Sequence, residues 1–318
     1  MNPRFAGWPE TNDFKWFGIR KGWDLPEEYR QEFMQEYKPM WDFWQKEFRA
    51  FDPKAEPIWG EKGAPNFRAD FNQPQPAVGL RIHEGAPRPM VLVCPGGGFM
   101  WKACYEGTIV AERFYDEGFN VAVLDYRVCP YAHADSTADA IRAVRYLRAN
   151  AARLNTPADK IAMMGFSAGS MLTGYCATMF DAGDPDAADP VERCSSRPDA
   201  AVLCYGAGSG VTASQGLLHY DRAAQAEAAK DAIERRVRLE CPPFFIWQCA
   251  GQDDPRNATQ LADVLATCGV PFELHIFPYG KHGTALSNEM HPDEKANDPH
   301  AAHWVEMCCE WLRMELGC

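Results

Sequence analysis

The sequence predicts an α/β fold with a mostly parallel central sheet and helices on both of its faces. Apolar runs of strand length recur from about residue 78 onward, and segments of helical composition separate them. This alternation is typical of parallel sheets, whose strands are buried on both faces and are therefore almost continuously apolar. Ligands of such sheets bind at the carboxyl ends of the strands, so the residues after each apolar run are the first candidates for a functional site.

Each strand is an apolar run bounded by turn-forming residues, and each helix is a longer stretch in which Ala and charged residues recur. The predicted strands are 78–82, 90–94, 121–124, 161–164, 200–205, 243–249 and 271–277. The predicted helices are 137–151, 168–179, 225–239 and 300–316.

A serine lies in a tight turn directly after the predicted strand at 161–164. Residues 165–169 read G-x-S-x-G, with glycines at both ends of the turn. A strand-to-helix turn of this kind holds the serine in a strained backbone region, and glycines avoid the collisions that larger neighbours would cause. The five-residue pattern also occurs by chance in many chains. Its place after a buried strand makes Ser167 the candidate nucleophile.

A glycine run follows the predicted strand at 90–94. Residues 95–99 read Pro-Gly-Gly-Gly-Phe, and such a run exposes backbone N–H groups. Preorganised N–H donors stabilise the oxyanion that forms in acyl transfer, and each is worth roughly 3 kcal/mol. We expect Gly97 and Gly98 to supply two donors of an oxyanion hole, and Ala168, which follows the serine, to supply a third. The alternative is that the run is only a flexible surface turn.

The candidate base and acid follow two later strands. His282 lies in the loop after the predicted strand at 271–277, where an imidazole can act as a general base. The strand at 243–249 is followed by Asp253 and Asp254, and one of these would orient the imidazole and stabilise its protonated form. We prefer Asp253 because it is the first carboxylate after the strand, and Asp254 is the alternative acid.

Four segments carry a resemblance to a known family: 94–99, 124–127, 165–169, and 269–275 followed by 280–283. With the order Ser, Asp, His, the chain resembles α/β-hydrolases of the esterase/lipase group, in particular bacterial acetyl esterases and acetyl-xylan esterases. The resemblance covers roughly residues 75–318. Pro95 stands where relatives similar to hormone-sensitive lipase have His, which favours the acetyl-esterase branch. The acidic loop after residue 252 is shorter than the usual pattern, which leaves the choice of Asp open.

The resemblance implies hydrolysis of short carboxylic esters, with acetyl groups on a carbohydrate or another small alcohol as the expected substrates. In this reaction Ser167 attacks the carbonyl, His282 transfers the proton, and water releases the acyl group. The reaction needs no metal and no organic cofactor. The alternatives are an amidase or peptidase on the same scaffold, and a hydrolase fold that only binds its partner.

The amino-acid composition of the chain argues against some binding partners and some cellular compartments. The net charge of −12 is spread along the chain without a basic stripe, which argues against a nucleic-acid partner. No window approaches the roughly 20 apolar residues that cross a bilayer, and the N-terminus has no signal-peptide pattern, so we expect a cytoplasmic protein without a membrane partner. The 12 cysteines are scattered singly and are read as free, mostly buried thiols.

Two segments lie outside the regular alternation. Residues 1–60 hold six of the ten tryptophans and include a helix that starts near Asp24, so we expect an aromatic-rich helical extension. Its apolar face could pack on the core, cover the site or form a contact between subunits of a homo-oligomer. Residues 61–318 form the catalytic domain, in which 206–240 is either a small cap or a connection remote from the site.

Overall fold

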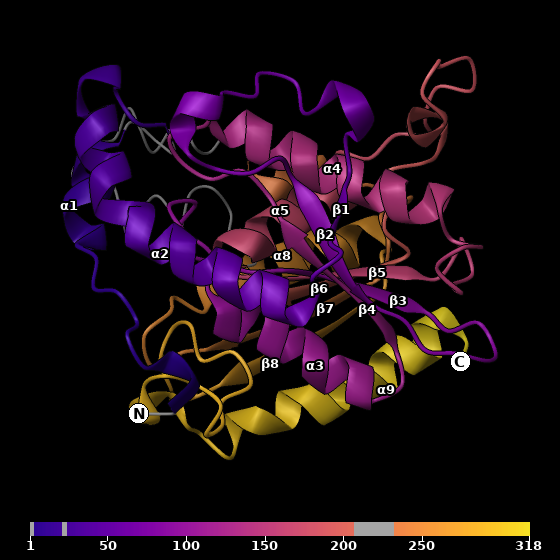
Figure 1. Cartoon of the computed structure of the whole chain (residues 1–318). Coiled ribbons are helices and arrows are strands. Elements are labelled where there is room, and N and C mark those ends of the chain that lie inside the picture. Colours follow the sequence, from indigo (N-terminus) through magenta and orange to yellow (C-terminus); the bar gives the residue numbers. More distant parts are fainter. Residues whose placement is uncertain (1–2, 21–23, 207–231) are drawn as a thin grey trace.

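The computed structural model describes residues 3–20, 24–206 and 232–318. Its centre is one eight-stranded sheet in the order β1-β2-β4-β3-β5-β6-β7-β8 (Figure 1). β1, β2 and β4 pair in antiparallel fashion, and every other neighbouring pair is parallel. The predicted α/β class is confirmed. The strands are β1 (Glu56–Pro57), β2 (Ala77–Arg81), β3 (Met90–Cys94), β4 (Asn120–Asp125), β5 (Ile161–Phe166), β6 (Ala200–Cys204), β7 (Phe244–Cys249) and β8 (Phe272–Phe277).

Alternate residues of each central strand face two separate hydrophobic clusters. On β3, Leu92 and Cys94 face the cluster under α4, α5 and α8, whereas Val91 and Val93 face the cluster under α3 and α9 (Figure 1). All five residues of β3 are buried, because this strand lies between β4 and β5 with helices on both faces. The helices are α3 (Thr108–Asp116), α4 (His133–Ala149), α5 (Ala168–Thr178), α8 (Arg256–Cys268) and α9 (Trp304–Leu316).

The structure adds elements that the apolar pattern did not predict, and it moves one boundary. β1 has no apolar run, and the helices α3 and α8 were not predicted. α4 begins at His133, before the predicted start at residue 137. Its first turn is polar because it binds the loop after β4: the Ser136 hydroxyl donates to the carbonyl of Arg127 at 2.7 Å.

The N-terminal segment packs its aromatic side chains on the sheet and its helices. It contains α1 (Asp13–Ile19) and α2 (Arg30–Phe51), and a 3-10 turn at Glu27–Tyr29 leads into α2. The apolar face of α2 is buried, and Trp44, in its second half, is 1% exposed and donates its indole N–H to Asp125 at 2.8 Å. α2 contacts β2 and α3, and the short β1 adds an edge strand beyond β2.

The predicted cap at 206–240 lies largely outside the described residues, which resume at Ala232. The prediction of a helix up to residue 239 is wrong over its described end: Ile233–Arg236 form a 3-10 turn, and Val237 is already extended. The reason is a long-range contact of Arg238, whose guanidinium donates to the carbonyls of Thr178 and Phe180 at the end of α5. These bonds tie Arg238 to the end of α5, and a turn closed by the hydrogen bond from the N–H of Cys241 to the carbonyl of Arg238 follows before β7.

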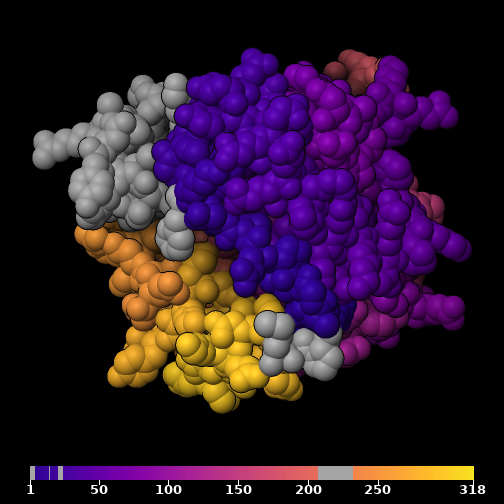
Figure 2. All heavy atoms as spheres, turned by 60° about the vertical axis from the view of Figure 1, so that its left-hand side comes forward, coloured from indigo at the N-terminus to yellow at the C-terminus, as the bar shows by residue number. Residues whose placement is uncertain are grey.

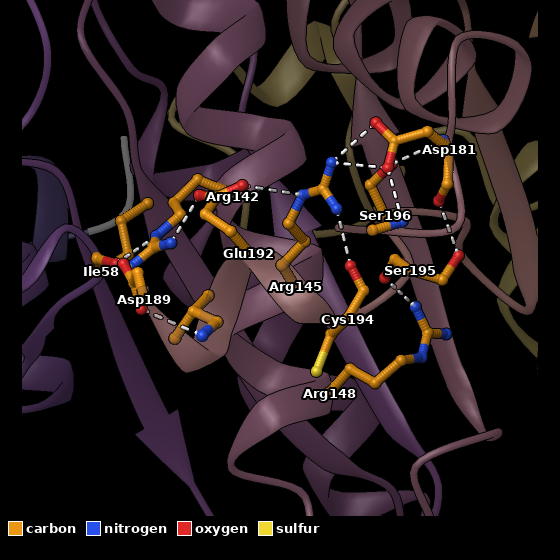
Figure 3. A network of polar contacts seen from close by, with 12 residues as sticks. Ile58, Arg142, Arg145, Arg148, Asp181, Asp189, Glu192, Cys194, Ser195 and Ser196 are labelled. Atoms are coloured by element: carbon orange, nitrogen blue, oxygen red, sulfur yellow. Dashed lines mark hydrogen bonds and ion pairs between the residues drawn. The ribbon is translucent and has the colours of Figure 1, made fainter. Parts of the chain in front are cut away.

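A ladder of arginines on α4 anchors the segment between α5 and β6 (Figure 3). Arg142, Arg145 and Arg148 recur every three residues, so they project from one side of the helix. Arg142 pairs with Asp189 at 2.6 Å and Arg145 with Asp181 at 2.7 Å. This network fixes a surface segment without contributing to the site described below.

All 12 cysteines are free, and nine of them are buried, which confirms the prediction of mostly buried thiols. Within residues 3–20, 24–206 and 232–318, no helix combines the length and the apolar character needed to cross a bilayer.

Candidate active site

Ser167 occupies a sharp turn between β5 and α5. Its backbone dihedral angles are φ 51° and ψ −117°, a region that residues with a side chain rarely adopt. A Cβ on Gly165 would lie 2.0 Å from the carbonyl oxygen of Gly169, and a Cβ on Gly169 would lie 2.0 Å from that of Cys94. The strand and the helix can therefore approach this closely only with glycine at both positions, and the turn places Ser167 at the carboxyl edge of the sheet.

Three loops at this edge bring Ser167, His282 and Asp253 together. The Oγ of Ser167 lies 2.8 Å from Nε2 of His282, in the loop after β8. The other ring nitrogen, Nδ1, lies 2.8 Å from Oδ1 of Asp253, in the loop after β7. Because β5, β7 and β8 are parallel members of one sheet, their carboxyl ends meet at the same edge, although Ser167 and His282 are 115 residues apart in the chain.

The structure does not bring Asp254 to His282. Its carboxylate is held by its neighbour Arg256, whose Nε donates to both carboxylate oxygens at 2.9 Å. The hydrogen bonds from Arg256 lower the pKa of Asp254, which keeps it ionised on the surface. The loop after β8 that carries His282, called the imidazole loop below, is also fixed by Gln252, which the sequence analysis did not single out. The Oε1 of Gln252 accepts the backbone N–H of His282 at 2.9 Å.

Two N–H groups of the glycine run after β3 are left without an acceptor by the hydrogen bonds of the loop. The carbonyl of Gly96 accepts the N–H of Ala103 at 3.1 Å, and the carbonyl of Gly97 accepts the N–H of Met100 at 2.9 Å. In a trans peptide the N–H points opposite to the C=O, so these bonds turn the N–H groups of Gly97 and Gly98 away from the loop. Neither of these N–H groups, nor that of Ala168, has an acceptor in the part of the chain that the structure describes.

A buried carboxylate that sequence reasoning missed lies beneath the glycine run. Glu106 is 3% exposed, and its Oε2 accepts the N–H of Gly96 at 2.9 Å. Its Oε1 accepts the hydroxyl proton of Tyr205 at 2.8 Å, and the Tyr205 oxygen accepts the N–H of Ala285, in the imidazole loop, at 3.0 Å. No signal marked Glu106, because it follows the glycine run in an irregular segment with no apolar periodicity.

The surroundings of His282 favour its protonated form. Burial lowers the pKa of His282, but the hydrogen bond and negative charge of Asp253 and the charge of Glu106 raise it more. The pKa therefore lies above its ordinary value of 6.5. The side chain of His282 is 39% exposed and that of Asp253 is 17% exposed, so the imidazole is accessible from outside while the carboxylate beside it is more sheltered.

The N-terminal segment holds the glycine run from outside. Arg20, which is buried, donates from Nη1 to the carbonyl of Gly98 at 2.7 Å, and Trp41 donates its indole N–H to the carbonyl of Met100 at 2.8 Å. A Cβ on Gly98 would lie 2.8 Å from the ring of Phe17 on α1. Figure 2 shows the N-terminal atoms (indigo) packed across the face seen in this view, where they adjoin the C-terminal segment (yellow). The sequence left open what the aromatic face of this segment covers.

This arrangement can transfer a proton and receive a developing negative charge. A hydroxyl bonded to an imidazole, which is itself bonded to a carboxylate, is the arrangement that activates a serine oxygen. Unpaired N–H groups beside it can stabilise an oxyanion. Among the residues that the structure describes, no group of three or more His, Cys, Asp or Glu side chains is arranged to hold a metal ion.

Known proteins resemble this chain in sequence and in structure. The BD-FAE family model matches residues 79–206. Endo-1,4-beta-xylanase B of Butyrivibrio fibrisolvens is 31% identical over 253 residues, which are 74% of this chain. The chain spans only 38% of the length of that relative.

Solved structures match over more of their length. The acetyl ester-xyloside bifunctional hydrolase of Caldicellulosiruptor lactoaceticus has 32% identity and a TM-score of 0.73, and the match covers 83% of this chain and 96% of that one. A carboxylesterase of Lactobacillus plantarum, with 21% identity and a TM-score of 0.64 over 76% of this chain and 92% of that one, shares the fold. With this fold and this degree of similarity, the chain belongs to the acetyl-esterase-like branch of the α/β-hydrolase esterases.

Proposed function

We propose that the protein is a serine esterase that cleaves short-chain carboxylic esters, with acetyl esters of a carbohydrate or small alcohol as substrates. The observation that carries this proposal is the hydrogen-bonded chain from Ser167 through His282 to Asp253, each contact 2.8 Å long. It lies beside a glycine run in which the N–H groups of Gly97 and Gly98 have no acceptor among the described residues. Acyl transfer needs an activated nucleophile and, close to it, N–H donors for the negative charge that develops, and this arrangement offers both.

In the proposed reaction His282 takes the proton of Ser167 as the hydroxyl oxygen attacks the ester carbonyl. Asp253 accepts a hydrogen bond from Nδ1–H, so Nε2 is the nitrogen that is free to accept a proton. The charge of Asp253 also stabilises the imidazolium that results. The N–H groups of Gly97, Gly98 and Ala168 bind the oxyanion, at roughly 3 kcal/mol for each donor. His282 then returns the proton to the leaving alcohol, and water attacks the acyl-enzyme by the reverse sequence of proton transfers. No metal or organic cofactor takes part.

The acyl preference and the alcohol are inferred from relatives. The solved relative with 32% identity is called an acetyl ester-xyloside hydrolase, and the curated relative is called a xylanase. An acetylated sugar therefore agrees with both names. Under this proposal residues 61–318 form the catalytic domain, and residues 1–60 form an extension that supports its glycine run through Arg20 and Trp41.

The test is a comparison of kcat/KM for p-nitrophenyl acetate, butyrate and octanoate, followed by acetate release from acetylated xylo-oligosaccharides. Acetate should be the best of the three acyl groups, because each methylene that the pocket excludes costs about 1–3 kcal/mol of transition-state binding. Ser167→Ala should lose about 10⁴-fold or more in kcat while it remains folded. A maximum at octanoate would reject the acetyl-esterase assignment, and faster cleavage of p-nitroacetanilide than of p-nitrophenyl acetate would favour an amidase.

A further inference from the structure

Glu106 lies at the meeting point of three loops of the site, yet it touches none of the reacting atoms. It ends the 3-10 turn Cys104–Glu106, which follows the glycine run. A Cβ placed on Gly96 would lie 2.6 Å from Oε2 of Glu106 and 2.8 Å from the Cβ of Ser167. The carboxylate is therefore packed directly against the backbone that separates it from the serine, and it is almost entirely shielded from solvent.

The hydrogen bonds around Glu106 match an ionised carboxylate. Gly96 donates its N–H to Oε2, and Tyr205 donates its hydroxyl proton to Oε1 while it accepts the N–H of Ala285. Gly96 and Tyr205 each bring a donor to the carboxylate, whereas a neutral carboxyl group would place its own proton opposite one of these two donors. Burial raises the pKa of Glu106 above its ordinary value, and the hydrogen bond from Tyr205, the charge of His282 and the hydrogen bond from Gly96 offset only part of that rise.

The imidazole of His282 lies within electrostatic reach of this buried carboxylate. On its Nδ1 side lies Asp253, at 2.8 Å, and the ring of Tyr205 packs edge-on to the imidazole with the centroids 5.1 Å apart. Two other titratable side chains of its own loop, Lys281 and His291, have partners of their own. Lys281 binds Asp293 at 2.8 Å, and His291 contacts the carbonyl of Gly283. Two carboxylates, Asp253 and Glu106, therefore act on one imidazole.

We propose that Glu106 is a positioning residue that acts in two ways: its charge stabilises the imidazolium of His282, and its two hydrogen bonds tie the glycine run to the imidazole loop. This inference rests on the proposed esterase function. The first tie runs from Glu106 to the N–H of Gly96, one residue before the proposed oxyanion donors. The second runs through Tyr205 to Ala285, three residues after His282. One side chain thus sets the distance between the oxyanion site and the base.

The first variant is Glu106→Gln, which has the same shape but no charge. Its amide oxygen can still accept the N–H of Gly96, but its NH₂ group then meets the hydroxyl of Tyr205, whose proton has no other acceptor among the described residues. Loss of a nearby negative charge makes the imidazolium less stable, so the pKa of His282 should fall by about one unit. The acid limb of kcat/KM should move to lower pH by the same amount, and kcat should fall about tenfold with KM nearly unchanged.

The second variant, Glu106→Asp, keeps the charge but is one methylene too short to reach both Gly96 and Tyr205. It should lower kcat while the acid limb stays at the wild-type position. This variant also keeps the proposal testable if Glu106→Gln fails to fold, because wild-type kcat in Glu106→Asp would overturn the positioning role. The matched control is Glu117→Gln, which removes a carboxylate that pairs with Arg113 and Arg313 at the far end of α3 and should move neither quantity.

The readout that separates this inference from the esterase proposal is NMR titration of ¹³C-labelled histidine, with the His282 signal assigned by its loss in His282→Gln. It needs no substrate. A lower His282 pKa in Glu106→Gln, but not in Glu117→Gln, supports the inference even if no ester is hydrolysed. An unchanged His282 pKa in a folded Glu106→Gln protein overturns it, whatever the activity. Absence of ester hydrolysis by the wild-type protein would instead refute the proposed function alone.

Discussion

Asp253 and Asp254 are adjacent in the chain, and the geometry predicts opposite outcomes when each is replaced by Asn. Asp253 accepts the Nδ1 proton of His282 at 2.8 Å, and this fixes the tautomer in which Nε2 can accept a proton from Ser167. An amide at this position would present N–H donors, favour the proton on Nε2, and set that proton against the serine hydroxyl. The base would then be in the wrong form before any substrate binds.

The expected loss for Asp253→Asn is about 10⁴-fold in kcat, which corresponds to about 5.4 kcal/mol of transition-state stabilisation. Asp254→Asn should change kcat by less than about twofold. Its partner Arg256 is 68% exposed, and substitutions on such surfaces usually alter free energies by no more than about 0.5 kcal/mol.

The assay is kcat for p-nitrophenyl acetate at a pH on the plateau of the wild-type profile. Circular dichroism and a thermal melt on each variant show that both are folded. Because the two residues are neighbours and the chemical change is the same, each variant serves as the control for the other. Equal losses, or a larger loss for Asp254→Asn, would refute the assignment of Asp253 as the acid.

Three further predictions concern the same site. Because the pKa of His282 is raised and the base must be neutral, kcat/KM should fall as the pH drops through a midpoint above 6.5; a midpoint below 6 would contradict this. Gly169→Ala puts a methyl group 2.0 Å from the Cys94 carbonyl and should lower the free energy of unfolding by about 1–3 kcal/mol or more in urea titrations. Arg20→Leu removes the bond to Gly98 and should lower kcat by up to roughly 100-fold with little change in KM, whereas unchanged kcat would separate the N-terminal segment from catalysis.

Much of the site could be predicted because its residues follow strand ends. Apolar runs mark where β3, β5, β7 and β8 stop, and parallel strands end at a common edge, so the glycine run, Ser167 and His282 had to lie near one another. The same reasoning could not choose between Asp253 and Asp254, since both follow β7. That choice depends on Arg256, at the start of α8, whose guanidinium donates to the carboxylate of Asp254.

The parts that could not be predicted depend on contacts between distant segments. Glu106 and Tyr205 are 99 residues apart, and neither lies in a motif. Arg20 and Gly98 are 78 residues apart, so patterns of neighbouring residues could not predict that the N-terminal segment supports the glycine run. Removal of residues 1–60 would delete α2 and expose the apolar surface that its aromatic face covers, so point substitutions test this segment more cleanly than truncation.

The central claim is that Ser167 forms a covalent bond with the acyl group, and an active-site phosphonate tests it most directly. The protein is treated with a fluorophosphonate at neutral pH, digested, and analysed by mass spectrometry. The account predicts one adduct per chain, on the peptide that contains Ser167, and loss of labelling in both Ser167→Ala and His282→Gln. An adduct on another serine such as Ser170, or labelling that persists in Ser167→Ala, would contradict it.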